Sequence, residues 1–265
     1  EVISFWIANP KFTFAESLTY HRLIEVNTFA YHFLLKIIFI MFGYSVEAGR
    51  LFSVVFSSLS ILSVGYLNWY LSKNKSFFLT FFLISFNIFL ISYSQEIRLY
   101  SLLFFFASLS LIFFFKTIFE KKNTYLALYF IITLSLVLLH PFALIIIFSY
   151  LLYFGWLIVK NKKILYSLII ITFIIIVIST LFYYHSFLLA ASSISTEYFW
   201  MQNPKLKFLT NFYFSSFFGS RLMGLIFLII FLSLVTFNIK KIRDQSFLNI
   251  MLIIVVLSYY NLNFY

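Results

Sequence analysis

The chain has 265 residues, of which 63% are hydrophobic and 10% are charged, and its mean hydropathy is +1.02. A soluble domain is about 45–50% apolar and about 25% charged. The composition therefore excludes an ordinary soluble globular domain and predicts a polytopic membrane protein. Because the chain has no cysteine, disulfides and thiolate metal sites are excluded as well.

Apolar runs separated by polar residues predict an all-α transmembrane bundle of about eight spans. In chain order the expected spans are 48–72, 77–95, 99–119, 125–139, 142–159, 164–184, 222–239 and 246–263. The run from 125 to 159 is divided because one helix of this length would cover about 52 Å, against a hydrocarbon core of about 30 Å. His140 and Pro141 lie near its middle and mark the turn. Residues 37–43 are too short to span, so we expect them in a helix that lies in the membrane interface.

The chain begins at Glu1 without a signal-peptide pattern, and it ends within an apolar run. We therefore expect residues 1–265 to form one transmembrane domain that is a fragment of a longer protein.

The basic residues predict the orientation of the spans, because cytoplasmic loops carry an excess of lysine and arginine. Eleven of the 19 basic residues fall on alternate loops, which we assign to the cytoplasmic face: Lys73, Lys75, Lys116, Lys121, Lys122, Lys160, Lys162, Lys163, Lys240, Lys241 and Arg243. The opposite, outer face holds six of the eight acids and all four histidines. The net charge of +11 thus follows from topology, and we expect no nucleic-acid partner.

A short polar segment between two expected spans carries Gln95, Glu96, Arg98 and Tyr100 on the outer face. Two interpretations fit it. In the first, Arg98 extends to the interface and pairs with a glutamate that only ends a helix. In the second, the carboxylate orients a polar ligand, and the planar guanidinium of Arg98 binds a phosphate at membrane level.

His140 has two interpretations as well. A histidine before proline at a turn is often a loop residue that hydrogen-bonds the backbone. The topology, however, puts it on the same face as Glu1, Glu25, Glu96 and Arg98, which favours a shared site.

Three segments resemble GT-C glycosyltransferases, in the branch related to protein O-mannosyltransferases, aminoarabinose transferases and rhizobial lipopolysaccharide glycosyltransferases. "YSQEIRLYSLLFFFASLSLIFFFK" (93–116) resembles that family's "YSQEaRmYaLllllallslylf". "NTFAYHFLLKIIFIMFGYSVEAGRLFS" (27–53) resembles "HPPLYYLLLklwlklFGdSefaLRlps", although Asn27-Thr28-Phe29 replaces His-Pro-Pro. "LALYFIITLSLVLLHPFALIII" (126–147) places His140 on the family's histidine. In this order the segments cover roughly the first 160 residues.

The resemblance implies an inverting transferase that moves a sugar from a polyprenyl-phosphate donor to a lipid, glycan or protein acceptor. The site would face outward from a bacterial cytoplasmic membrane. Glu1 would be the second member of the family's Asp-Glu pair, whose aspartate, the base, would precede this chain. The implied catalytic residues are Glu1 and Glu96, and the implied substrate-binding residues are Gln95, Arg98, Tyr100, His140 and Glu25. Arg98 would bind the donor phosphate, and Glu96 and His140 would shape the site or hold a divalent cation.

Three alternatives stay open. A transporter or flippase would need polar groups near the bilayer midplane, whereas here they lie on the outer side. A catalytically inactive scaffold is the second alternative. A polymerase or ligase of lipid-linked surface polysaccharide is the third, and basic residues in the long 185–221 loop favour it: Lys205, Lys207 and Arg221.

Overall fold

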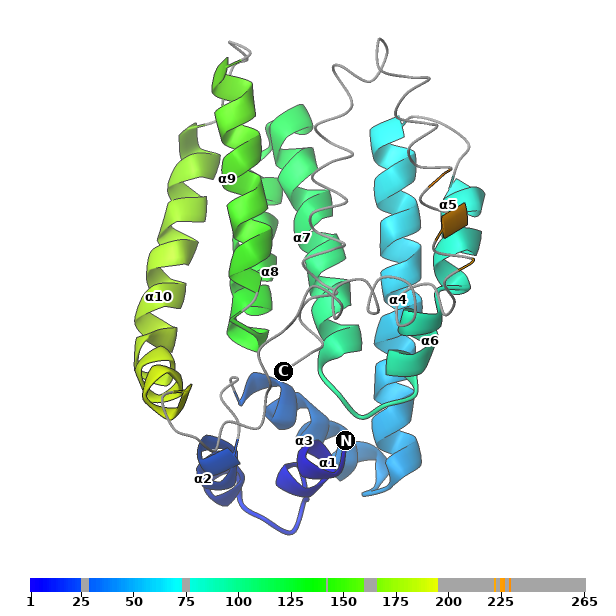
Figure 1. Ribbon diagram of the computed structural model, residues 1–265, viewed down its shortest axis with the longest axis vertical. Coiled ribbons are helices and arrows are strands. Elements are labelled where there is room, and N and C mark those ends of the chain that lie inside the picture. The colour runs from blue at the N-terminus through cyan, green and yellow to red at the C-terminus, as the bar shows by residue number, and fades with distance from the viewer. Residues whose placement is uncertain are drawn as a thin grey trace. The chain divides into compact units, whose positions relative to one another are not determined.

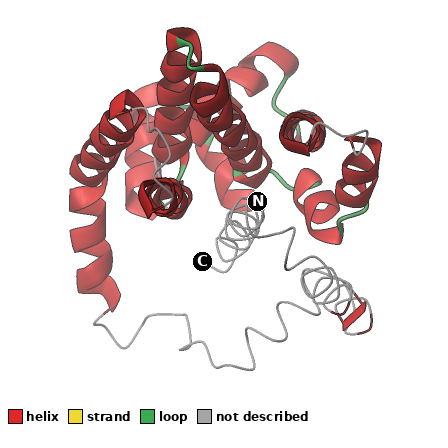
Figure 2. Cartoon of the chain, turned by 90° about the horizontal axis from the view of Figure 1, so that it is seen from above, coloured by secondary structure: helices red, strands yellow, loops and turns green. Residues whose placement is uncertain are grey.

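The computed structural model describes residues 1–24, 29–72, 77–141, 143–159 and 166–194, together with Leu222, Leu225, Ile226 and Ile229. Within these residues every regular element is an α-helix, which confirms the all-α prediction (Figure 2). The elements are α1 (Val2–Ile7), α2 (Phe14–Ile24), α3 (Ala30–Phe42), α4 (Val46–Ser72), α5 (Phe77–Ser85), α6 (Ile88–Ser94), α7 (Tyr100–Glu120), α8 (Asn123–Leu139), α9 (Ala143–Val159) and α10 (Tyr166–Ile194).

Three of these helices are long and apolar enough to cross a membrane: Val46–Leu71, Tyr100–Glu120 and Tyr166–Tyr183. Among the described residues, α3, α8 and most of α9 are apolar but shorter. By length and composition, the described residues thus contain three candidate membrane spans, against the eight that the sequence predicts for the whole chain. The expected spans 222–239 and 246–263 lie outside the described residues, apart from the four single positions.

The predicted span 77–95 is wrong as a single helix, because α5 ends at Ser85 and α6 begins at Ile88. The Ser85 hydroxyl donates to the Phe81 carbonyl at 2.7 Å, an i−4 bond that weakens a helix end. Asn87 then follows, and asparagine favours turns over helix interiors. The predicted span 164–184 agrees with the candidate span Tyr166–Tyr183, although the helix itself, α10, continues to Ile194.

The expected interfacial helix 37–43 is in fact part of a longer helix, α3. Its buried residues are Tyr31, His32, Leu35, Lys36 and Phe39, which share one face at helical spacing. Three of these five side chains are polar, so hydropathy alone does not predict which face of α3 is buried.

The chain divides into two compact units, of which the first comprises Glu1–Phe86, Leu90–Leu144 and Leu165–Ala190. The second comprises Asn87–Phe89, Ile145–Ile164 and Ala191–Tyr265, and its described part is mainly α9. In the first unit α7 packs against both α4 and α8 (Figure 1). A buried row of small residues on α4, Ser53, Ser57 and Ser60, allows close helix packing.

Hydroxyl groups also join neighbouring helices of the first unit. Ser110 of α7 and Thr133 of α8 lie 2.8 Å apart, and the Tyr183 hydroxyl of α10 donates to the Val137 carbonyl of α8 at 2.8 Å. Such interhelical bonds are typical of helices that pack in a membrane, where the apolar surface alone gives little specificity.

The turn between α7 and α8 fixes which residues share an end of the first unit. Lys121 ends α7 in the left-handed conformation (φ 54°), and its N–H donates to the Thr117 carbonyl at 3.1 Å. The chain therefore reverses, and α8 runs back alongside α7 (Figure 1). The segment before α7 and His140 after α8 consequently lie at one end, and Lys121 and Lys122 lie at the other.

The first two helices are tied to α3 by one buried lysine. Lys36 is 2% exposed, and its ammonium donates to the carbonyls of Asn9 and Phe12, both at 2.7 Å, and to the Ser17 hydroxyl at 2.9 Å. A capping box starts α2, because the Thr13 N–H donates to the Glu16 carboxylate at 2.6 Å and the Glu16 N–H donates to the Thr13 hydroxyl at 3.2 Å.

Candidate functional site

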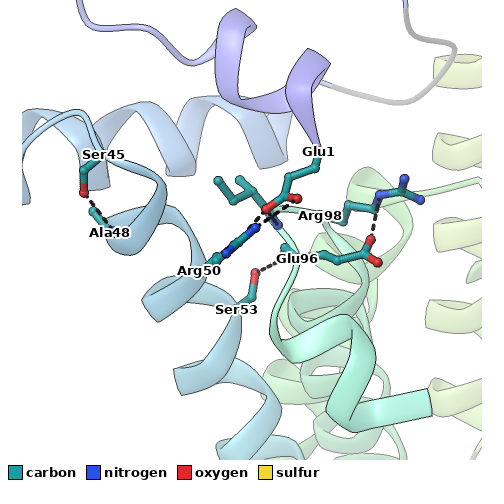
Figure 3. A network of polar contacts seen from close by, with 8 residues as sticks. Glu1, Ser45, Ala48, Arg50, Ser53, Glu96 and Arg98 are labelled. Atoms are coloured by element: carbon teal, nitrogen blue, oxygen red, sulfur yellow. Dashed lines mark hydrogen bonds and ion pairs between the residues drawn. The ribbon is translucent and has the colours of Figure 1, made fainter. Parts of the chain in front are cut away.

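Glu1 lies at the N-cap of α1 and accepts hydrogen bonds from two distant segments (Figure 3). Arg50, in the first turns of α4, donates through Nε to Oε1 at 3.0 Å and through Nη2 to Oε2 at 3.4 Å. The backbone N–H of Ile97 donates to Oε1 at 3.3 Å. The Arg50 hydrogen bond, helped by that from Ile97, lowers the pKa of Glu1 below its ordinary value although burial opposes the shift. Glu1 is therefore ionised at neutral pH.

Gly49 and Ser53 of α4 hold the Gln95–Leu99 segment close to Glu1. A Cβ on Gly49 would lie 2.8 Å from Cδ1 and 3.0 Å from Cγ1 of Ile97, so only glycine leaves room for this side chain. One turn later, the Ser53 hydroxyl donates to the Glu96 carbonyl at 2.7 Å (Figure 3). Gly49 and Ser53 thus allow the Gln95–Leu99 segment to pack closely against α4.

Glu96 and Arg98 form the ion pair of the first interpretation of this segment, with Nε of Arg98 3.0 Å from Oε2 of Glu96 (Figure 3). The side chains of Arg98 and Glu96 are 43% and 37% exposed, so the pair itself adds little stability. Within the described residues, the Nη atoms of Arg98 make no hydrogen bond or ion pair. This leaves one edge of the guanidinium fork for an anionic ligand.

Two further predicted residues flank this ion pair. Gln95 is exposed, with its backbone N–H donating to the Ser92 carbonyl at 3.1 Å. Tyr100 begins α7, is 8% exposed, and packs edge-on against Tyr93 with ring centroids 4.8 Å apart. Tyr100 is thus a buried packing residue beside this segment, whereas Gln95 is exposed.

His140 ends α8 at the same end of the first unit, where it is 7% exposed. Burial lowers its pKa from 6.5 to about 4, so it is neutral at pH 7. In the part of the chain that the structure describes, no three histidine, aspartate or glutamate side chains gather as a metal site would require. The divalent cation at Glu96 and His140 stays a prediction, and Glu25 lies outside the described residues.

Arg50 is the principal residue of this cluster that the sequence analysis did not select. It lies 49 positions from its partner Glu1, so no local motif pairs the two. The one available signal was the segment "SVEAGRLFS", in which Arg50 falls on the arginine of the GT-C pattern "SefaLRlps". Tyr31 is a second residue that the sequence analysis did not select, and it lies in the same segment, 27–53, that resembles the family.

No family model matches the chain, and comparison with curated proteins and with solved structures also gives no match. The likeness to GT-C glycosyltransferases is therefore carried by the three quoted segments alone. What the geometry adds is that Glu1, Arg50, Glu96 and Arg98 come together from three separate parts of the chain, beside helices that can cross a membrane.

Proposed function

We propose that the protein is a membrane glycosyltransferase that moves a sugar from a polyprenyl-phosphate donor to a hydroxyl of a lipid, glycan or protein acceptor. The site would lie on the outer side of a bacterial cytoplasmic membrane. The observation that carries the proposal is the cluster of two carboxylates and two guanidinium groups at one end of a helical unit that contains long apolar helices. A lipid-linked donor has its tail in the bilayer and its phosphate at the membrane interface, which is where the ends of membrane-spanning helices lie.

Arg98 is the residue proposed to bind the donor phosphate. Its Nη edge is exposed and can form paired hydrogen bonds with phosphate oxygens. When the bond from the anomeric carbon to the phosphate oxygen breaks, negative charge develops on the leaving phosphate. A guanidinium fixed by Glu96 stabilises that charge without first reorienting. In-line attack by the acceptor hydroxyl inverts the anomeric carbon.

Glu1 is proposed to position the acceptor rather than to remove its proton. Its pKa is lowered by the hydrogen bond from Arg50, and a carboxylate with a lowered pKa is a weak base. A carboxylate that stays ionised can accept a hydrogen bond from the attacking hydroxyl and fix its direction. The resemblance assigns the base to an aspartate that would precede Glu1, and Glu96 acts by holding Arg98.

The test is transfer by the protein in liposomes, with a labelled polyprenyl-phosphate sugar as donor. We expect Arg98→Ala to abolish transfer and to leave membrane insertion intact, and Arg98→Lys to restore only part of it, because an ammonium lacks the planar fork. Arg22→Ala is the matched control, since Arg22 is an exposed arginine of α2. Transfer by Arg98→Ala at the wild-type rate would refute the role assigned to Arg98.

A further inference from the structure

The hydroxyl of Tyr31 is buried on α3. The side chain lies on the buried face of α3 and is 1% exposed, and Oη finds no partner among the described residues. A buried hydroxyl that has lost its water and gained no protein partner destabilises the fold, so native proteins rarely keep one without a reason.

Two other fully buried tyrosines have a hydroxyl partner among the described residues. Tyr129 is 0% exposed and its hydroxyl lies 2.9 Å from the Thr172 hydroxyl. Tyr183 is 1% exposed and donates to the Val137 carbonyl at 2.8 Å. The helix packing thus satisfies these two phenols, whereas the phenol of Tyr31 has no such bond among the described residues.

Tyr31 lies beside the candidate site. Its ring packs against Phe52 of α4, with centroids 6.3 Å apart, and the same part of α4 carries Arg50 and Ser53, which contact Glu1 and the Glu96 carbonyl. The charges of Glu1 and Arg98 both act on the hydroxyl. Burial, together with the charge of Glu1, raises the pKa of Tyr31, so the phenol stays protonated and serves as a donor.

We infer that Tyr31 is a substrate-binding residue of this site, and that its hydroxyl donates a hydrogen bond to an oxygen of the phosphate that Arg98 binds. The inference rests on the proposed function. A phosphate diester offers only acceptor oxygens to the protein, so an unpaired donor and the free edge of a guanidinium are complementary to it. The side chains of Glu1 and Arg98 are 29% and 43% exposed, so a phosphate can approach this side of the site without disturbing the packed helices.

The test compares Tyr31→Phe with Tyr129→Phe, which make the same chemical change at buried tyrosines. Dodecyl phosphate is titrated by calorimetry into the protein in phosphatidylcholine nanodiscs, and thermal unfolding is measured in parallel. We expect Tyr31→Phe to bind dodecyl phosphate about five- to tenfold more weakly while its melting temperature stays the same or rises. We expect Tyr129→Phe to bind normally and to melt at a lower temperature, because the buried hydrogen bond between Tyr129 and Thr172 is lost.

Arg98→Ala separates failure of this inference from failure of the proposed function. If Arg98→Ala loses affinity while Tyr31→Phe binds as tightly as wild type, the role of Tyr31 is overturned and the phosphate site stands. If neither variant changes the affinity, the phosphate site itself is overturned, and the inference with it. A melting temperature for Tyr31→Phe as low as that of Tyr129→Phe would show that the hydroxyl has a partner within the protein, which also overturns the inference.

Discussion

Replacing Lys36 by methionine tests whether one buried ammonium fastens the first two helices to α3. Methionine keeps a long unbranched side chain in the space beneath the α1–α2 connection but donates no hydrogen bond. The change removes the ammonium that donates to three acceptors: the carbonyls of Asn9 and Phe12 and the hydroxyl of Ser17. The Asn9 carbonyl keeps one donor, the Phe12 N–H at 3.2 Å. It also removes the ammonium that lies 5.4 Å from the centre of the Phe14 ring.

The magnitude follows from how deeply these acceptors are buried. An acceptor that is buried and loses its donor costs about 1–3 kcal/mol. Ser17 is fully buried and bears this cost, whereas Asn9 and Phe12 are only half-buried, so water can reach their carbonyls. Removing a desolvated ammonium, whose pKa burial lowers, offsets part of the loss. We therefore expect a net destabilisation of about 1–2 kcal/mol.

Because Lys36 holds only the N-terminal helices, the loss should be local. Amide hydrogen exchange of residues 9–20 is expected to accelerate about 5- to 30-fold, which corresponds to about 1–2 kcal/mol, while exchange in α7 and α8 stays at the wild-type rate. Lys11→Met is the matched control, because Lys11 lies in the same connection but is exposed. Unchanged exchange in residues 9–20 of Lys36→Met would show that packing alone holds these helices.

Two further substitutions test the packing of the Gln95–Leu99 segment against α4 and the burial of His140. Gly49→Ala should displace Ile97, whose side chain already lies within 3.0 Å of the added methyl position, and so raise the pKa of Glu1 and slow transfer. Gly155→Ala, with nothing within 4 Å, is its control, and equal transfer by the two variants would contradict the close approach. Between pH 6.5 and about 4, His140 is protonated in the unfolded chain but not in the folded chain. The free energy of unfolding should therefore decrease by about 1.4 kcal/mol for each unit by which the pH is lowered. Thermal unfolding from pH 7 to 4 should show a shallower decline for His140→Gln, and an identical decline would exclude His140 as a cause.

The sequence predicted those helices that are marked by uninterrupted apolar runs. The expected spans 48–72 and 99–119 differ from α4 and α7 by one or two residues at their ends, because charged or turn-forming residues bound both runs. The division at His140-Pro141 is also present, between α8 and α9. The break between α5 and α6 was not predictable from hydropathy, because the residues on both sides of Asn87 are equally apolar.

The candidate site was only partly predictable, for a different reason. Glu96 and Arg98 are conspicuous because charge is rare between two apolar runs. Arg50 and Lys36 are harder to interpret, since each is one cation among several near a span, and its partner lies elsewhere in the chain. What distinguishes them is tertiary geometry: Glu1 is 49 residues from Arg50, and the three acceptors of Lys36 are 19 to 27 residues away. The burial of Tyr31 likewise depends on α4.

The hydrogen bond from Ile97 to Glu1 joins residues 96 positions apart, and this separation has a consequence for biosynthesis. A nascent chain that has left the ribosome only as far as α4 already contains Glu1 and Arg50 but lacks the third group that orients the carboxylate. The cluster is therefore completed late, when the segment that precedes α7 docks against Gly49 and Ser53. A chain released before Ile97 is synthesised would contain Glu1 and Arg50 and still be unable to form the complete cluster.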